Sequence, residues 1–334
     1  MKISEFVNKA LFDEKTGYYI TRNPLGDEGD FITAPEISSI FSEILAAYLL
    51  QICAVEKDNF AMVEMGAGRG VMMRDILNSI KKLADKKNPE ALNFLAKAQI
   101  NIIEIGEKLK EIQQENLKDF QINWHKNFSE FLEKTAGKIF FISNELFDCF
   151  AIDQYSFTEM GWCERIVGNE RFLLAPFDRE IHNFIESEMN ALVPMGSVYE
   201  INFAARDFMK TLCEALKNRG GMAVNIDYGY YKPERANTLQ ALKNHKSVTI
   251  FTKNCDITAQ VDFGALDKIA ANFNLGSSLV TQREFLISLG IKEREAILIA
   301  QNPQMQENIA LAVSRLIDEN QMGKLFKCHI IWKE

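Results

Sequence analysis

The feature that most constrains the fold is an apolar run that ends in three alternating glycines. Residues 60–65 lead into Gly66, Gly68 and Gly70, and a helical pattern follows from residue 71 to about residue 83. This order predicts a strand, a tight turn and a helix, because glycine adopts backbone dihedrals that other residues avoid. Such a turn lets a ligand lie against the main chain at a helix N-terminus. The alternative is an ordinary α/β turn that holds no ligand.

The spacing of the glycines argues against a nicotinamide dinucleotide site. Dinucleotide-binding turns carry G-x-G-x-x-G, whereas this chain has G-x-G-x-G. Glu64 stands two residues before the first glycine. An acidic residue there resembles the first motif of class I S-adenosyl-L-methionine (SAM) methyltransferases, whose ligand is cationic. We therefore expect Glu64 and the three glycines to bind SAM. A nicotinamide-dependent oxidoreductase is the alternative, since a fold does not fix a function.

Composition narrows the class of protein further. The chain has 334 residues, 47% of them hydrophobic, which is enough for a large α/β core. The net charge of −8 argues against nucleic acid as the main partner and is compatible with a cationic substrate.

The six cysteines and four histidines of the chain are dispersed, so we expect free thiols and no metal site. No apolar run is long enough to span a membrane, and the N-terminus resembles neither a signal nor a transit peptide. We expect a cytoplasmic protein.

The order of elements predicts a Rossmann-like α/β sheet with helices on both faces and one inserted unit. Residues 1–50 are expected to form a helical lid segment, in which one helix starts at Pro35 and runs on through Tyr48. Residues 51–150 would form the cofactor-binding core, and residues 201–334 the remainder of the core with the C-terminal helices. Residues 151–200 break the βαβ rhythm, because polar and apolar residues alternate there between glycine turns. They therefore predict an antiparallel β-meander with a helix.

Carboxylates follow several predicted strands of the core. Glu104 ends the second strand, where an acidic residue accepts hydrogen bonds from ribose hydroxyls in doubly wound sheets. Glu145 and Asp148 follow the fourth strand, and Asp227 follows the fifth. Open α/β sheets bind ligands at this edge, so we expect these side chains beside the cofactor. The alternative after the fourth strand is that Asn144 caps a helix whose dipole Glu145 stabilises.

Short segments spread along nearly the whole chain carry a family resemblance, namely GYY (17–19), GDFITAPE (29–36), EMGAGRG (64–70), NELFD (144–148), DYGY (227–230), DITAQVDF (256–263) and MGKLFK (322–327). Together they resemble the MidA family of class I SAM-dependent methyltransferases, and their order along the chain makes the resemblance specific. This chain departs from the family at Ala67, where proline is usual, and at Gln260, where histidine is usual; glutamine cannot titrate near neutral pH.

The resemblance implies SAM as cofactor and a protein substrate that carries an arginine. Family members look like protein arginine methyltransferases, and the mitochondrial ones are implicated in the assembly of respiratory complex I. A complex I subunit is therefore the implied substrate. A non-catalytic assembly chaperone that retains a SAM site is the alternative.

An arginine acceptor assigns roles to the predicted site residues. Arginine is protonated near pH 7, so carboxylates would orient its guanidinium group. We expect Glu145 and Asp148 to do this, with Asp227 in a lesser part. The lid segment would close the cofactor site through three residues, namely Thr33, Pro35 and Glu36.

Overall fold

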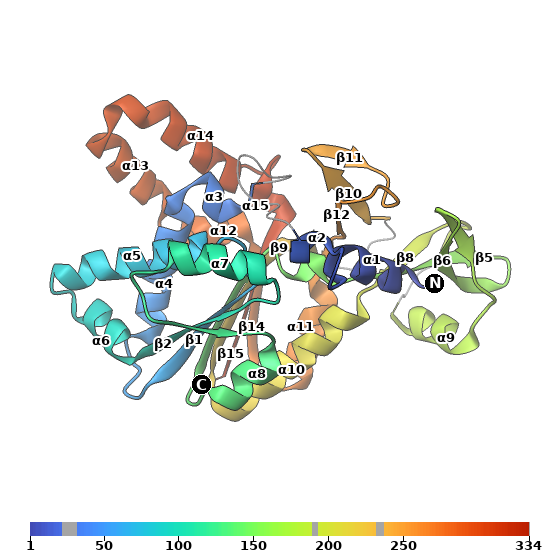
Figure 1. The fold of residues 1–334 in the computed structure, drawn as a ribbon, viewed down its shortest axis with the longest axis horizontal. Helices are drawn as coiled ribbons and strands as arrows, with labels where there is room; N and C mark the ends of the chain where they lie inside the picture. The colour runs from blue at the N-terminus through green and yellow to red at the C-terminus, as the bar shows by residue number, and fades with distance from the viewer. Residues whose placement is uncertain (22–31, 189–192, 232–236, 334) are drawn as a thin grey trace.

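A mostly parallel sheet forms the centre of the molecule (Figure 1). The computed structural model describes residues 1–21, 32–188, 193–231 and 237–333. In this part of the chain the sheet has the order β14-β15-β9-β4-β1-β2-β3, and β13 pairs with β9. The strands are β1 (Phe60–Met65), β2 (Ala98–Ile103), β3 (Ile122–His125), β4 (Ile139–Asn144), β9 (Gly221–Tyr230), β13 (Val261–Asp262), β14 (Gly276–Thr281) and β15 (Phe326–Lys333).

The register of the parallel strands aligns the residues that follow them. Glu64 of β1 lies opposite Ile102 of β2 and Ile142 of β4. The glycine turn and the segments that begin at Glu104 and Glu145 therefore leave the sheet at the same edge. β15 runs antiparallel to both β9 and β14. The central strands read as continuous apolar runs because helices cover both of their faces.

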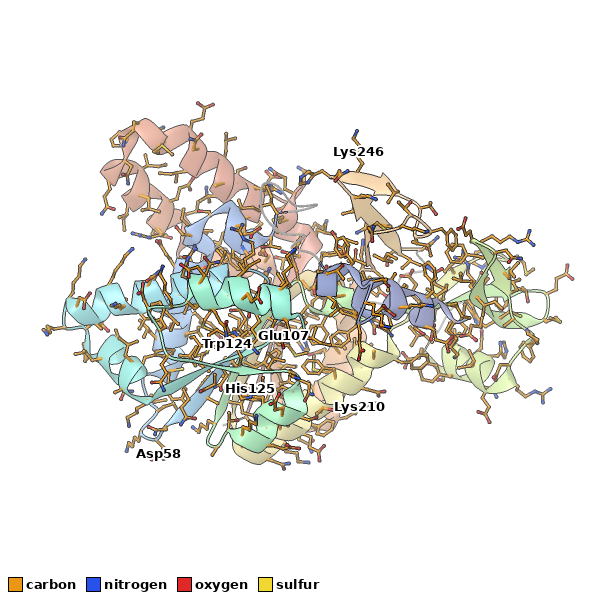
Figure 2. All side chains as sticks on the ribbon, in the orientation of Figure 1. Asp58, Glu107, Trp124, His125, Lys210 and Lys246 are labelled. Atoms are coloured by element: carbon orange, nitrogen blue, oxygen red, sulfur yellow. The ribbon has the colours of Figure 1, made fainter. Side chains whose placement is uncertain are left out.

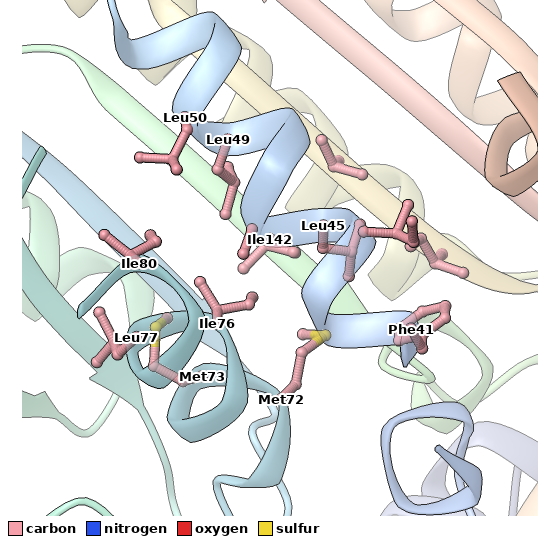
Figure 3. Packing of buried hydrophobic residues seen from close by; sticks show 14 of the residues in the cluster. Phe41, Leu45, Leu49, Leu50, Met72, Met73, Ile76, Leu77, Ile80 and Ile142 are labelled. Carbon is pink, nitrogen blue, oxygen red and sulfur yellow. The ribbon is translucent and has the colours of Figure 1, made fainter. Parts of the chain in front are cut away.

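Two helical layers bury the two faces of the sheet. On one face, α4 (Ser39–Cys53) and α5 (Val71–Asp85) pack over β1 and β4, and Figure 3 shows their side chains around Ile142. α6 (Pro89–Lys97) completes this layer. The other face is covered by α8 (Phe128–Lys134), α10 (Phe203–Arg219) and α11 (Phe263–Asn272). α7 (Glu107–Asn116) follows β2.

The N-terminal segment is made of short helices, α1 (Ile3–Phe12), α2 (Tyr18–Thr21) and α3 (Ala34–Ile37). The prediction of one helix from Pro35 through Tyr48 is wrong. Ser38 has an extended backbone, and its hydroxyl accepts a hydrogen bond from the Ile40 amide at 3.3 Å. This bond caps the start of α4 and separates it from α3. Part of the GDFITAPE segment, residues 29–31, lies outside the described residues.

The inserted antiparallel unit is present. It consists of β5 (Asp153–Thr158), β6 (Gly161–Gly168) and β7 (Arg171–Leu174), joined by β8 (Val198–Ile201) and α9 (Arg179–Glu188). A second small sheet contains β10 (Gln240–Lys243), β11 (Lys246–Val248) and β12 (Asp256–Thr258). Both small sheets contact α1, and Figure 1 shows α1 and these sheets to the right of the main sheet.

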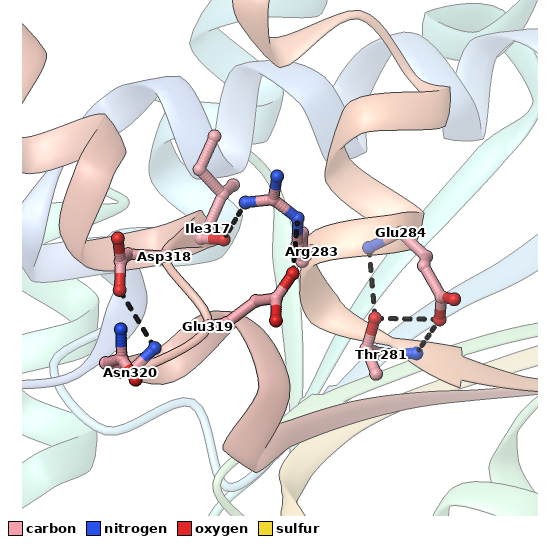
Figure 4. Close-up of polar contacts among 7 residues, drawn as sticks. All are labelled: Thr281, Arg283, Glu284, Ile317, Asp318, Glu319 and Asn320. Atoms are coloured by element: carbon pink, nitrogen blue, oxygen red, sulfur yellow. Dashed lines mark hydrogen bonds and ion pairs between the residues drawn. The ribbon is translucent and has the colours of Figure 1, made fainter.

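The C-terminal helices α12 (Gln282–Ser288), α13 (Ile291–Gln301), α14 (Gln306–Ile317) and α15 (Met322–Leu325) extend the first helical layer. Thr281 and Glu284 form a reciprocal cap at the start of α12. Arg283 donates to the Ile317 carbonyl at 2.8 Å, which ties α12 to the end of α14 (Figure 4). Within the described ranges no helix combines the length and apolarity needed to cross a membrane.

The central strand β4 gives a test of the core. Ile142 is 0% exposed, whereas Ile297 on α13 is 49% exposed. Ile142→Ala should lower the free energy of unfolding by about 2–5 kcal/mol, because it removes buried methyl groups and leaves a cavity. The same change at Ile297 should stay within about 0.5 kcal/mol of wild type. Urea denaturation measures both, and equal losses in the two variants would contradict this packing.

Candidate active site

A cavity of about 520 Å³ opens at the carboxyl edge of the sheet, in front of the glycine turn. Gly66 and Gly68 line it, with backbone φ angles of 72° and 52°. At Gly66 a Cβ atom would lie 2.9 Å from Leu146 Cδ1, so a larger residue would be both strained and crowded. The turn therefore presents bare main chain to the cavity.

Gly70, the third glycine, faces α7 instead. A Cβ atom on Gly70 would lie 3.2 Å from Leu117 Cδ1 and 3.4 Å from Gln113 Cγ. Its φ of 75° also suits the left-handed cap at the start of α5. The geometry thus gives Gly70 a packing role, and its predicted contact with the cofactor stays a prediction.

Glu64 lies at the floor of the cavity and is 2% exposed. Its carboxylate accepts the backbone N–H of Met73 in the first turn of α5. The Oε2 atom is buried and has no hydrogen-bond partner among the described residues. Burial raises the pKa of Glu64 to about 8. Because an unpaired buried carboxylate is costly, this atom is suited to a cationic ligand.

Glu104 also lines the cavity, directly after β2. Its Oε1 accepts the Gly106 amide at 2.8 Å, and its Oε2 accepts the Gln113 side-chain amide at 2.9 Å. Burial raises the pKa of Glu104, and these donors oppose that rise. The carboxylate is therefore held in a fixed orientation at the place where ribose ligands sit in doubly wound sheets.

The short helix α3 closes one side of the cavity. Thr33, Pro35 and Glu36 all line it. Glu36 Oε1 lies 3.4 Å from Arg69 Nη1, which links α3 to the glycine turn. The Ala34 amide donates to Glu145 Oε1 at 3.3 Å, which links α3 to the end of β4. Through Glu36 and the Ala34 amide, α3 thus contacts the elements on both sides of the cavity.

Glu145 lines the cavity and has a φ of 52°, in the left-handed region. The alternative that Asn144 caps a helix is wrong, because the chain forms only a three-residue 3-10 turn at Phe147–Cys149, with Leu146 at its N-cap. Asn144 is instead the last residue of β4, and its amide donates to Glu145 Oε1 at 3.0 Å. Burial raises the pKa of Glu145 to about 7.

Asp148 and Asp227 lie behind the cavity wall. Asp227 is 0% exposed, and its carboxylate accepts the amides of Phe147 at 2.8 Å, Asp148 at 3.1 Å and Tyr228 at 2.8 Å. Asp148 is held by the Tyr228 and Cys149 side chains, and its buried Oδ1 has no partner among the described residues. Burial and the charge of Glu145 raise the pKa of Asp148 to about 7. Asp227 therefore shapes the segment that carries Glu145 and Asp148.

The apolar part of the cavity is made of residues that were not among the predicted site residues. Ile105 lines it and is 60% exposed, although an isoleucine is usually buried. The sequence signal that could have placed Ile105 at the cavity is its position directly after Glu104. Phe12 and Tyr19 come from the N-terminal helices and stack with ring centroids 5.8 Å apart. Nothing in the local pattern places these two aromatic rings beside residues from the core. The remaining wall residues come from helices, strands and loops, and include Lys126, Asn127, Cys149 and Phe150.

Comparison with known proteins identifies the class. Residues 44–279 match the family described as "Putative S-adenosyl-L-methionine-dependent methyltransferase". The match covers more than half of the 334 residues, so the chain belongs to this family of SAM-dependent methyltransferases. The fold and the G-x-G-x-G turn agree with this assignment, which leaves the nicotinamide alternative without support.

Individual relatives agree along the whole chain. The mitochondrial protein arginine methyltransferase NDUFAF7 of Rattus norvegicus is 26% identical and is aligned over 97% of this chain and 79% of its own length. The homologue from Drosophila melanogaster is 27% identical over 97% of this chain and 80% of its own. A crystal structure from Burkholderia thailandensis, bound to S-adenosyl-homocysteine, has a TM-score of 0.84 and 25% identity, and covers 100% of this chain and 88% of its own.

The cavity fits the cofactor of this family. Its volume lies within the roughly 300–1,000 Å³ that is usual for ligand pockets. When bound, SAM supplies a methyl group on a cationic sulfonium. We propose that the main chain of Gly66 and Gly68 would contact it, that Glu64 would face its cationic part and that Glu104 would bind the ribose. The unpartnered Oε2 of Glu64 is the observation that favours this assignment.

Glu64 should make SAM binding depend on pH. Its pKa of about 8 leaves it mostly protonated at neutral pH in the free protein. A cation in the cavity lowers this pKa, so binding releases a proton and affinity rises with pH. A glutamine side chain does not titrate, so Glu64→Gln has no proton to release here when the cation binds. The ratio of wild-type to variant affinity should therefore rise about tenfold between about pH 6 and about pH 8.5, as measured by calorimetry.

Wild type and variant bind the same SAM, so the ratio of their affinities cancels any effect of the ionisation of SAM itself. Calorimetry in buffers of different ionisation enthalpy counts the released proton directly. Glu133→Gln, on the exposed side of α8, is the matched control and should behave as wild type. A ratio that does not change with pH would show that Glu64 is not near the bound cation.

The first expected effect of removing the Asp227 carboxylate is a loss of protein stability. Asp227→Ala leaves three amides without their acceptor, which should cost about 2 kcal/mol or more in the free energy of unfolding. Asp207→Ala, at an exposed position on α10, is the control and should cost less than about 0.5 kcal/mol. Urea denaturation compares the two, and an Asp227 variant as stable as wild type would refute the positioning role.

Proposed function

We propose that this protein transfers a methyl group from SAM to an arginine of a protein substrate. The observation that carries the proposal is the Glu145 carboxylate, which lines the cavity beside the glycine turn. A guanidinium group needs fixed acceptors, because it stays protonated at neutral pH. Glu145 is held by the Ala34 and Asn144 donors, both on Oε1. It can therefore accept a guanidinium N–H without reorganising.

The charge around the cavity favours a cationic acceptor. Four of its lining residues are glutamates, namely Glu36, Glu64, Glu104 and Glu145. Among the described residues, the lining cations are Arg69 and Lys126, and Arg69 is paired with Glu36. Asp148 adds a further carboxylate behind the wall. We propose that Glu145 contacts the guanidinium, that Asp148 supports it electrostatically, and that Asp227 positions both.

Methylation requires the acceptor to lose a proton. The guanidinium nitrogen gains a methyl group and gives up one proton, so the charge of the acceptor is unchanged at the end of the reaction. Glu145, with a pKa of about 7, is suited to accept this proton near neutral pH. Neighbouring carboxylates of Asp256 and Glu36 contribute to that raised pKa, after burial.

The relatives support the same acceptor. Those named above are protein arginine methyltransferases aligned over almost the whole of this chain. We further propose a subunit of respiratory complex I as the substrate, which rests on the family resemblance alone. A non-catalytic SAM-binding chaperone is the alternative, and turnover of a protein substrate distinguishes the two.

The proposal predicts a pH-dependent rate. Methyl transfer should rise with pH through an apparent pKa near 7, because Glu145 must be ionised to orient the acceptor and take its proton. Glu145→Gln should lower the rate about 100-fold or more and flatten this profile. The side-chain oxygen of the glutamine can still accept a hydrogen bond from the Ala34 amide, so the contact with α3 and the SAM affinity should stay close to wild type. Single-turnover kinetics measure the rate.

Stability separates this effect from misfolding. The pKa of Glu145 is higher in the folded protein than in the unfolded chain, so its contribution is favourable at low pH and is lost as pH rises through about 7. Glu145→Gln should therefore be no less stable than wild type above neutral pH. A normal rate in this variant would refute the role of Glu145.

The acceptor itself can be identified directly. Proteins from a deletion strain are incubated with isotopically labelled SAM and the purified enzyme, and tryptic peptides are analysed by mass spectrometry. Label on arginine supports the proposal, and label confined to other residues contradicts it. SAM binding without any turnover would favour the chaperone.

A further inference from the structure

One buried side chain joins the carboxyl ends of three neighbouring strands. Gln113 lies on α7 and is 0% exposed. Its Nε2 donates to the Gly68 carbonyl of the turn after β1 at 2.9 Å, and to Glu104 Oε2 after β2 at 2.9 Å. Its Oε1 accepts from Trp124 Nε1 of β3 at 3.2 Å. Trp124 is labelled in Figure 2, where it lies next to α7.

These partners fix which way the amide faces. The Gly68 carbonyl and the Glu104 carboxylate are both acceptors, so they require the two N–H bonds of a side-chain amide. The indole of Trp124 only donates, so it requires the amide oxygen. A side chain of this length that donates twice and accepts once must be glutamine, because glutamate offers no such pair of donors and methionine offers none.

The amide also fixes the peptide plane of the glycine turn. In a trans peptide the C=O and the following N–H point in opposite directions. The bond to Gly68 O therefore turns the Arg69 N–H away from α7. Asn116, one turn along the same helix, donates to the Arg69 carbonyl at 2.8 Å. Two amides on one face of α7 thus hold consecutive carbonyls of the turn, and Gly70 allows the helix to approach this closely.

We propose that Gln113 is a positioning residue for cofactor binding, which holds the glycine turn and the Glu104 carboxylate in one fixed arrangement. It acts through Gly68 and Glu104, both of which line the cavity. Without it the turn has an unpaired carbonyl and Glu104 loses its side-chain donor. Part of the binding energy would then be spent on ordering these groups. The proposal does not depend on the identity of the methyl acceptor.

Two variants of nearly equal shape test this role. Gln113→Met removes both donors, and Gln113→Glu replaces them by a carboxylate. Gln114, the next residue on α7, is exposed, so Gln114→Met and Gln114→Glu are matched controls for helix propensity and net charge. Calorimetry with SAM and with S-adenosyl-homocysteine should show about 10- to 100-fold weaker binding for Gln113→Met, and wild-type binding for both controls.

The pH profile separates positioning from loss of structure. Glu104 bonds directly to the side chain at this position, Glu64 interacts electrostatically with Glu104, and Arg69 is the cation of the turn. In Gln113→Glu, two carboxyls face each other and can share one proton at low pH, which restores one hydrogen bond. Above neutral pH both ionise and repel. Glu64 titrates in both variants, so the ratio of the SAM affinity of Gln113→Glu to that of Gln114→Glu should fall as pH rises.

Thermal unfolding of the ligand-free proteins completes the test. If Gln113→Met unfolds, Gln113→Glu at low pH still reports on the role, because its shared proton replaces one donor. SAM affinity in Gln113→Met equal to that of Gln114→Met would overturn the proposal. So would a Gln113→Glu affinity with the same pH profile as Gln114→Glu.

Discussion

The parallel pairing of β4, β1 and β2 is the constraint on which the site depends. It brings three chain segments out of the sheet at one edge, where the glycine turn, Glu104 and Glu145 meet around one cavity. The first helical layer, packed around residues such as Ile142, keeps that register fixed. A slip of one residue would turn the side chains of a strand to the opposite face. The packing that stabilises the core therefore also fixes the geometry of the site.

The carboxylates at this edge make the ligand-free protein sensitive to pH. The pKa values of Glu64, Glu145 and Asp148 are raised, to about 8, 7 and 7, chiefly by burial. A group whose pKa is higher in the folded state stabilises the fold at low pH and loses that contribution as pH rises through the folded pKa. Their ionisation between about pH 6 and about pH 8 therefore opposes folding. A cationic ligand offsets this cost, since it favours the ionised forms.

The short helix α3 links the part of the cavity beside the glycine turn to the part beside Glu145. α3 contacts the glycine turn through the Glu36–Arg69 pair and the end of β4 through the Ala34–Glu145 bond. Arg69 in turn follows Gly68, whose carbonyl Gln113 holds. The cofactor position proposed at the turn and the acceptor position proposed at Glu145 therefore share a connected set of polar contacts. Such contacts let occupation of one part of the cavity favour order in the other.

The sequence by itself determined the strand–turn–helix unit, the antiparallel insertion and the set of carboxylates at strand ends, because these depend on local periodicity and on the common edge of parallel strands. Tertiary structure decided what each carboxylate does. Glu64 and Glu145 line the cavity, whereas Asp227 is occupied by three amides. It also decided the roles of Gln113 and of the Phe12–Tyr19 pair, whose partners are distant along the chain. Hydrogen-bond partners and burial arise from packing, and no local pattern encodes them.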